Sequence, residues 1–376
     1  MKEDVFQLTR NKKTGGVVGL DIEAGSIAAA EVRSNGSTKV VGTAIEPLAS
    51  GAFHDGEVVD ADLLSEALKD LFAKHKLSKQ VRLGIGNQQV VVRTLRLPMI
   101  EDAKEMDAAV RFQAQEQVAM PLDEAVLEHQ IVGGVAGEDG STPQVEVVVV
   151  AARREMVGAI LKPLRSAGLE PVGVDLSAFG MIRALTDIDP DAGAVPAPAE
   201  EEAADEETVP QPGDAVLYCN LGDAINLAVA RDRGCLFTRM AATGLEEISA
   251  RLAGGTGLSQ EHAAQWLTHV GLDTPVESIE GDPQIVGEAR RILEDGVLAL
   301  VDEIRLSLDY YGAQEGAVRV GRIVLSGPGS AIPGLPERMR AGLGLPISVA
   351  RPAALSAFGS AVAARLTLPY GLALED

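Results

Sequence analysis

The stretch GLDIEAGSIAAAEV, residues 19–32, places a short glycine-containing turn between two apolar runs. A second stretch, YCNLGDAINLAVA, residues 218–230, repeats this arrangement in the later part of the chain. Each predicts a strand, a tight turn and a returning strand, because short apolar runs bounded by turn residues are typical of hairpins. Two such hairpins, separated by helical segments, indicate an α/β fold with two duplicated halves.

Further elements are expected around both hairpins. A third strand is predicted at residues 39–45, and an amphipathic helix at 61–75. From residue 90 to 176 the expected order is strand, helix, strand, strand, helix, strand, at 90–97, 100–117, 125–132, 145–151, 154–167 and 171–176. This order is typical of a split βαβ unit, so a small α+β module is predicted to be inserted into the first half. The last predicted helix covers the small residues of 355–364.

Residues 186–214 have a composition unlike the rest of the chain. They hold five prolines and ten acidic residues but no Lys or Arg. Such a segment buries too little apolar surface to offset its ordering entropy, so a disordered linker is predicted, serving as a spacer or as a partner-binding tail. The expected division is 15–89 for the first part of the first half, 90–170 for the inserted module, 171–185 for the return to the first half, 186–214 for the linker, and 215–376 for the second half with a helical insert at about 257–316.

The composition of the 376-residue chain narrows the classes of partner. Hydrophobic residues make up 46%, enough for sizeable cores, and the formal net charge is −22. A strongly acidic surface disfavours direct binding to nucleic acid or to a bare anionic membrane. We see neither a signal-peptide pattern nor an apolar run of membrane-spanning length, so a cytoplasmic protein is expected. Only Cys219 and Cys235 occur, which argues against a disulfide framework.

Three glycine-containing turns are candidate nucleotide-binding elements, at residues 21–26, 220–223 and 326–330. Backbone amides in such turns bind phosphate, and a carboxylate at a strand end holds Mg²⁺ through water. Each turn alone is more typical of an ordinary loop, whereas their order and spacing together favour a nucleotide cleft. The candidate residues are Asp21, which would also hold the metal, Gly25, Ser26, Asn220, Gly222, Gly327, Gly329 and Ser330.

The segment RLPMIEDAKEMDAAVRFQAQEQVAMPLDEAVLEHQIVG, residues 96–133, resembles the PilM family of type IV pilus assembly proteins. The similarity extends from Val17 to Leu374 except for the linker. It implies an actin-like (ribonuclease H-like) fold, related to that of FtsA, with ATP and Mg²⁺ between the halves. It also implies capture of the cytoplasmic N-terminal peptide of a PilN-like membrane protein beside the inserted module. Membrane contact would then be indirect, with other pilus platform proteins as further partners and self-association left open.

The chain departs from the family pattern at the nucleotide turns. Glu23 stands where the family has the glycine of Asp-Ile-Gly, and Asn220 stands where it has an aspartate. Pro328 removes a backbone donor from the third turn. The lysine usual after the first turn is replaced within 27–29, and the Ala-Glu-x-x-Lys helix motif is altered at 264–268. These changes predict weak ATP binding at most, no hydrolysis and no catalytic residue.

The inserted module supplies candidate residues for a peptide groove. Phe112, Met120 and Leu122 are apolar and either belong to the module's core or form pockets beside a strand edge. Three arginines either complement an acidic peptide or are simply solvated, namely Arg93, Arg96 and Arg111.

The leading interpretation is a cytoplasmic scaffold or adaptor of the type IV pilus assembly platform with a degenerate ATP cleft. The main alternative is an ATP-dependent switch or ATPase of a pilus or type II secretion platform. A filament-forming membrane anchor would require a basic amphipathic C-terminal helix, but residues 369–376 contain no Lys or Arg. A sugar or acetate kinase would require a metal-binding aspartate in each turn, which Asn220 does not provide.

Overall fold

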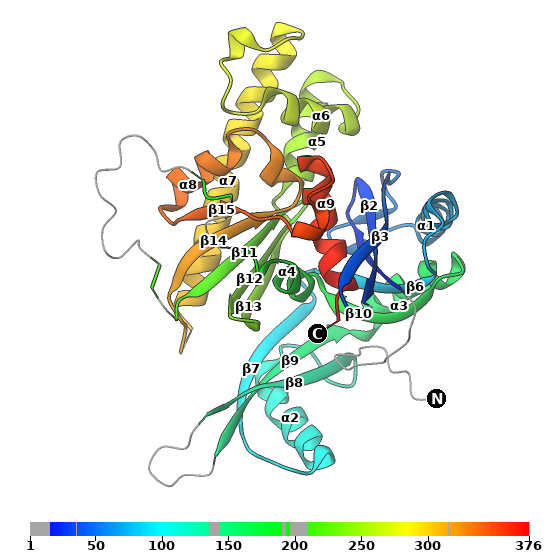
Figure 1. Cartoon of the computed structure of the whole chain (residues 1–376), viewed down its shortest axis with the longest axis vertical. Coiled ribbons are helices and arrows are strands. Elements are labelled where there is room, and N and C mark those ends of the chain that lie inside the picture. Colours follow the sequence, from blue (N-terminus) through cyan, green and yellow to red (C-terminus); the bar gives the residue numbers. More distant parts are fainter. Residues whose placement is uncertain are drawn as a thin grey trace.

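The computed structural model describes residues 16–34, 36–135, 143–189, 193–195, 210–211, 213–314 and 316–375. Two five-stranded sheets form its centre, and a smaller three-stranded sheet lies at one end of the elongated molecule (Figure 1). The two large sheets have the same strand order and the same strand directions. The duplication expected from the two hairpins is therefore confirmed.

The first sheet has the order β10-β6-β1-β2-β3. Three consecutive strands run antiparallel, and the remaining two lie parallel to the first of them. Every residue of the expected hairpin 19–32 pairs across the β1–β2 ladder or lies in its turn. The strands are β1 (Val17–Ile22), β2 (Ser26–Ser34), β3 (Thr38–Pro47), β6 (Gln80–Ile85) and β10 (Glu170–Leu176).

The second sheet has the order β13-β12-β11-β14-β15, which matches the first strand for strand. Again an antiparallel meander of three strands is extended by two parallel strands. Its members are β11 (Ala215–Leu221), β12 (Ile225–Arg231), β13 (Gly234–Ala241), β14 (Val320–Ser326) and β15 (Ile347–Val349).

Helices cover both sheets, and α9 (Ser360–Ala373) lies between them (Figure 1). It packs on β1, β2 and α4, and also contacts the turn after β14. The first half further holds α1 (Ala61–His75), α3 (Arg154–Ser166), α4 (Ser177–Leu185) and the short strands β4 (Phe53–His54) and β5 (Glu57–Val58). The second half holds α5 (Leu245–Thr256), α6 (Gln260–Val270), α7 (Pro283–Gly312), α8 (Leu335–Leu343) and single 3₁₀ turns at Val276–Ser278, Pro328–Ala331 and Ala353–Leu355.

The helix α1 illustrates how local sequence determines an element. Leu64, Leu68 and Leu71 recur at helical spacing and are at most 1% exposed. The Asp60 carboxylate caps the first turn by accepting the amide protons of residues 62 and 63. The helix ends at His75, and the following residue, Lys76, has a left-handed φ of 54°. The expected bounds 61–75 are confirmed.

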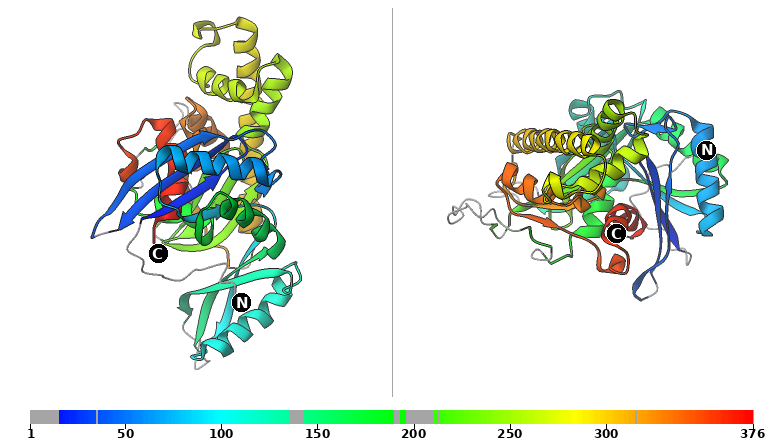
Figure 2. Two further views of the ribbon diagram at one scale, coloured as in Figure 1. Left: turned by 90° about the vertical axis from the view of Figure 1, so that its right-hand side faces the viewer. Right: turned by 90° about the horizontal axis from the view of Figure 1, so that it is seen from above.

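The inserted module consists of β7 (Val90–Pro98), α2 (Ala103–Gln117), β8 (Ala125–Val135) and β9 (Gln144–Arg153). Its sheet has the order β7-β9-β8, and α2 covers one face. The module has its own apolar core, in which Val110 and Val147 are fully buried. It projects from the lower end of the molecule, opposite α5, α6 and the beginning of α7 (Figure 2).

Four sequence expectations need correction. The split βαβ unit is wrong in its last two elements, because α3 packs on α1 and β10 joins the first large sheet. The elements β6, α4 and β15 were not anticipated. The last helix runs over 360–373 rather than 355–364, since burial of Leu366 and Leu372 outweighs the helix-breaking tendency of Pro369. Finally, residues 193–195 lie within the expected linker yet pair with the edge strand β15, where the side chain of Val195 is buried. Most of the linker lies outside the described residues.

Candidate functional site

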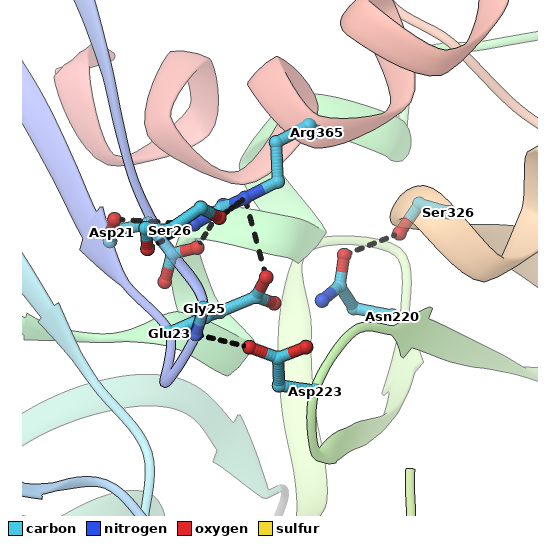
Figure 3. A network of polar contacts seen from close by, with 8 residues as sticks. All are labelled: Asp21, Glu23, Gly25, Ser26, Asn220, Asp223, Ser326 and Arg365. Atoms are coloured by element: carbon cyan, nitrogen blue, oxygen red, sulfur yellow. Dashed lines mark hydrogen bonds and ion pairs between the residues drawn. The ribbon is translucent and has the colours of Figure 1, made fainter. Parts of the chain in front are cut away.

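The first predicted turn meets a side chain from the far end of the chain. Asp21 lies one residue before the end of β1, with only 5% of its surface exposed. Its carboxylate accepts a hydrogen bond from the Arg365 guanidinium, which α9 carries into the space between the sheets (Figure 3). The two side chains are each 7% exposed. We predicted that Asp21 holds Mg²⁺ through water. In the structure, however, the Arg365 guanidinium already contacts this carboxylate.

Arg365 makes further contacts around the same turn. Its Nε donates to Ser26 Oγ at 3.0 Å and lies 3.2 Å from Glu23 Oε2. Its Nη2 donates to the main-chain oxygens of Asp21 at 3.4 Å and of Ser26 at 3.2 Å. The guanidinium fork is therefore surrounded by oxygen acceptors on several sides, as a buried charge requires.

The second predicted turn is joined to the first through two carboxyl groups. Asp223 Oδ2 accepts the backbone amide proton of Gly25 at 2.8 Å (Figure 3). In return, the carboxyl group of Glu23 lies against the backbone at Gly222, and the neighbouring Asp223 backbone acts to lower its pKa. A Cβ atom at Gly222 would collide with Oε1 of Glu23, so the space above this glycine is filled by that side chain.

Burial and charge oppose each other in this cluster. Burial raises the pKa of Glu23 to about 8, and the nearby Asp223 and Asp21 carboxylates act in the same direction, while Arg365 acts against them. Burial disfavours the charge of Arg365, but the Glu23 and Asp21 carboxylates outweigh it and raise the pKa of the guanidinium. At neutral pH the cluster thus combines one fixed positive charge with a Glu23 that tends to retain its proton.

The third predicted turn packs directly on the second. A Cβ atom at Gly327 would come within 2.7 Å of Asn220 Oδ1, and one at Gly329 would come within 2.8 Å of the Leu221 Cβ. Ser326 Oγ lies 3.4 Å from Asn220 Oδ1 (Figure 3). Ser330 Oγ donates to the Gly327 carbonyl oxygen at 2.7 Å, within its own turn. The turns that follow β11 and β14 pack so closely that Gly327 and Gly329 have no room for a side chain.

The three turns lie next to one another, but their present arrangement does not fit Mg²⁺-ATP. The cavity beside the first two turns has a volume of about 50 Å³. Pockets for nucleotide-sized ligands usually have volumes of about 300 Å³ or more. Glu23 occupies the space above Gly222, and Arg365 covers the carboxylate of Asp21. We therefore derive no chemical step through ATP or a metal ion.

A larger cavity, of about 580 Å³, lies where the inserted module meets the body. Two edge strands, β7 and β13, line it together with the turn before β7, the start of α4 and part of α7. Phe237 and Tyr310 form a tilted ring pair at 6.0 Å, and Tyr310 is 55% exposed. Arg239 donates to Glu303 at 2.7 Å on the same wall. We name this cavity the junction pocket.

Of the predicted peptide-groove residues, only Arg93 lines the junction pocket. Met120 and Leu122 pack against the module's core, whereas Phe112 is 69% exposed on α2. Arg111 is exposed. Arg96 Nε lies 3.4 Å from Glu146 Oε1 on the neighbouring strand β9. The structure therefore does not bring these six residues into one groove.

A known family of proteins matches the sequence of this chain over nearly its whole length. The family model described as "Type IV pilus assembly protein PilM" matches residues 19–371. The chain belongs to the PilM family. The match covers both halves and the inserted module, including the turns that hold Asp21, Asn220 and Gly327.

Solved structures agree on the fold. A chain of the "PilM-PilN type IV pilus biogenesis complex" superposes with a TM-score of 0.72 at 22% identity, covering 96% of this chain and 98% of that one. The ethanolamine utilization protein EutJ from Carboxydothermus hydrogenoformans gives 0.53 at 16% identity, over 99% and 93%. MreB5 of Spiroplasma citri bound to AMPPNP gives 0.52 at 11% identity, over 96% and 95%. This PilM-family chain thus has the actin-like α/β fold.

Sequence reasoning missed two side chains of the site. Arg365 was not considered, because its helix was expected to end at residue 364. Asp223 was included only as the end of a turn, although its carboxylate joins the two turns. A basic residue in an otherwise apolar helix, as Arg365 is in α9, was the available signal.

Across the part of the chain that the structure describes, no helix has the length and apolar character to cross a membrane.

Proposed function

We propose that this protein is an adaptor of the type IV pilus assembly platform that binds the cytoplasmic N-terminal peptide of a PilN-like membrane protein in the junction pocket. The family supplies the assembly role. The partner is suggested by the likeness to a chain of a PilM–PilN complex. The single observation that carries the binding site is the cavity of about 580 Å³ between two edge strands.

The pocket has the features that an extended peptide requires. Edge strands offer unpaired main-chain groups to an added strand, and alternate apolar pockets accept its side chains. Val91 and Met240 contribute apolar lining, while Phe237 and Tyr310 provide an aromatic wall. Arg93, Arg239 and Glu303 supply polar contacts that would fix the orientation of the peptide. Membrane attachment would then occur through the partner.

We propose further that this binding needs no nucleotide hydrolysis. The cavity at the predicted nucleotide turns, about 50 Å³, is far smaller than a nucleotide site, which supports a degenerate cleft. ATP binding is thereby less favoured than the adaptor role, and the alternative of an ATP-driven switch has no supporting contact in this cleft. The adaptor interpretation also leaves other platform proteins and self-association as further binding events to be tested.

The test is a titration of a fluorescent peptide, copied from the N-terminal cytoplasmic segment of the PilN protein of the same organism, into the purified chain. Tyr310→Ala should weaken binding at least about tenfold, since truncated aromatic anchors typically cost 1.4 kcal/mol or more. Thr238→Arg should abolish binding by filling the pocket, which Thr238 lines. Phe112→Ala is the matched control, because it removes an exposed aromatic ring of the module outside the pocket. Equal binding by all variants would refute the location, and loss only in Phe112→Ala would move it to α2.

A further inference from the structure

The two turns predicted to bind phosphate each hold a carboxyl group from the other turn. The Gly25 amide donates to Asp223 at 2.8 Å, and the Glu23 carboxyl group lies against the backbone at Gly222, beside the Asp223 amide. These amides are the donors that a nucleotide's phosphate oxygens would use. Since one residue of each pair lies in the first half and the other in the second, the exchange joins the halves across the cleft (Figure 3).

The position expected for a metal ion has a substitute as well. The Arg365 guanidinium contacts the carboxylate of Asp21 and lies 3.2 Å from Glu23 Oε2. A divalent ion at such a turn would be surrounded by carboxylate oxygens, main-chain oxygens and water. Arg365 instead brings a permanent charge and several donors on a covalent tether, so the compensation does not depend on the concentration of any ion.

We propose that Glu23, Asp223 and Arg365 are an internal substitute for Mg²⁺-nucleotide, which keeps the two halves of the molecule in their closed arrangement without a bound ligand. Glu23 and Asp223 take the place of phosphate oxygens at the two turns, and Arg365 takes that of the cation. The inference stands or falls independently of peptide binding in the junction pocket.

A second contact across the cleft supports the same arrangement. His54 Nδ1 in β4 lies 3.2 Å from Glu246 Oε1 in α5, and Glu246 also lines the small cavity. The closed cleft also shapes the junction pocket, because Ile85, Asn226 and Met240 line both cavities. The internal substitute would therefore hold the junction pocket in one shape at all times, rather than only when nucleotide is present.

Distances between two spin labels on the full-length chain test this inference. Both native cysteines are buried, and burial raises the pKa of Cys235 to about 12, so labels attach selectively at introduced cysteines. We would label Lys69→Cys on α1 and Gln265→Cys on α6, two exposed positions in different halves. Otherwise unaltered protein should give one narrow distance distribution that Mg²⁺-ATP at about 1 mM leaves unchanged.

Removing the substitute should open the cleft. Glu23→Ala combined with Asp223→Ala deletes both exchanged carboxyl groups, and the distribution should broaden or shift. Glu247→Ala is the matched control, because it removes an exposed carboxylate from the half that contains Asp223. Should the double variant fail to fold, the single change Asp223→Ala, which removes only one of the two carboxyl groups, should broaden the distribution in the same direction. Two results would overturn the inference: a shift of the unaltered protein on adding Mg²⁺-ATP, or an unchanged distribution in the folded variants.

Discussion

Glu23 lies where two opposing effects act on one carboxyl group. Its side chain is only 12% exposed and faces Asp21 and Asp223, which both favour the protonated form. Arg365, at 3.2 Å, favours the ionised form but is shared with Asp21. Three acidic side chains around one guanidinium would leave an excess of negative charge, and a proton on Glu23 reduces that excess. Residue chemistry thus makes the cluster sensitive to pH.

The pH dependence of stability should reveal this proton. Because burial raises the pKa of Glu23 from 4.5 to about 8, the folded state keeps a proton that the unfolded state loses. The stability contributed by Glu23 is therefore full below about pH 4.5 and declines as pH rises to about 8, by at most about 1.4 kcal/mol per pH unit. In Glu23→Gln this decline should be absent. Urea unfolding at about pH 5, 6, 7 and 8, which spans these two pKa values, measures the free energy of unfolding of both proteins. Parallel plots of that free energy against pH would contradict the prediction.

At the scale of elements, α9 occupies a slot made by close backbone approach. A Cβ atom at Gly371 would collide with the main-chain oxygen of Gly180 in α4. The end of the helix is held from the first half, since Arg82 Nη1 donates to the main-chain oxygens of Leu372 at 3.1 Å and of Leu374 at 2.5 Å. The position of Arg365 in the cleft therefore depends on how closely α9 packs.

A pair of Gly→Ala variants should separate packing from helix propensity. Gly371→Ala forces α4 and α9 apart and should lower the free energy of unfolding by about 1–3 kcal/mol or more. Gly287→Ala, in the helix α7, places its methyl group in open space and should raise stability by about 0.5–1 kcal/mol. Thermal unfolding followed by circular dichroism compares the two. Stabilisation by both changes would show that the α4–α9 contact is looser than described.

At the scale of the whole molecule, local patterns predicted more than long-range contacts. Both hairpins and α1 were found because their apolar spacing is a local property. The three turns were located by their glycines, and their meeting follows from the duplicated topology. Arg365 could not be paired with Asp21, because 344 residues separate them and Pro369 obscured the helix. A groove beside the inserted module was expected from the resemblance, but of the residues predicted for it only Arg93 lines the junction pocket, since its walls come from edge strands of different sheets.

The net charge of −22 is a further property of the whole chain. Repulsion between like charges destabilises a compact state, and salt screens exposed charges more than buried ones. Raising the salt concentration from about 0.01 M to about 0.3 M should therefore raise the unfolding temperature. Differential scanning calorimetry at the two salt concentrations tests this. A fall in the unfolding temperature would mean that exposed ion pairs outweigh the net repulsion.

The place of α9 in the chain has a consequence for biosynthesis. Residues 360–373 are synthesised after the strands of both large sheets, yet they fill the slot beside β1, which is made long before them. Until then Asp21 has no cation and the apolar walls around Leu368 and Leu372 stay open to water. We therefore expect the first half to stay incompletely packed until α9 has been made and closes its centre. A product cut short by premature termination would present that open slot to chaperones and proteases.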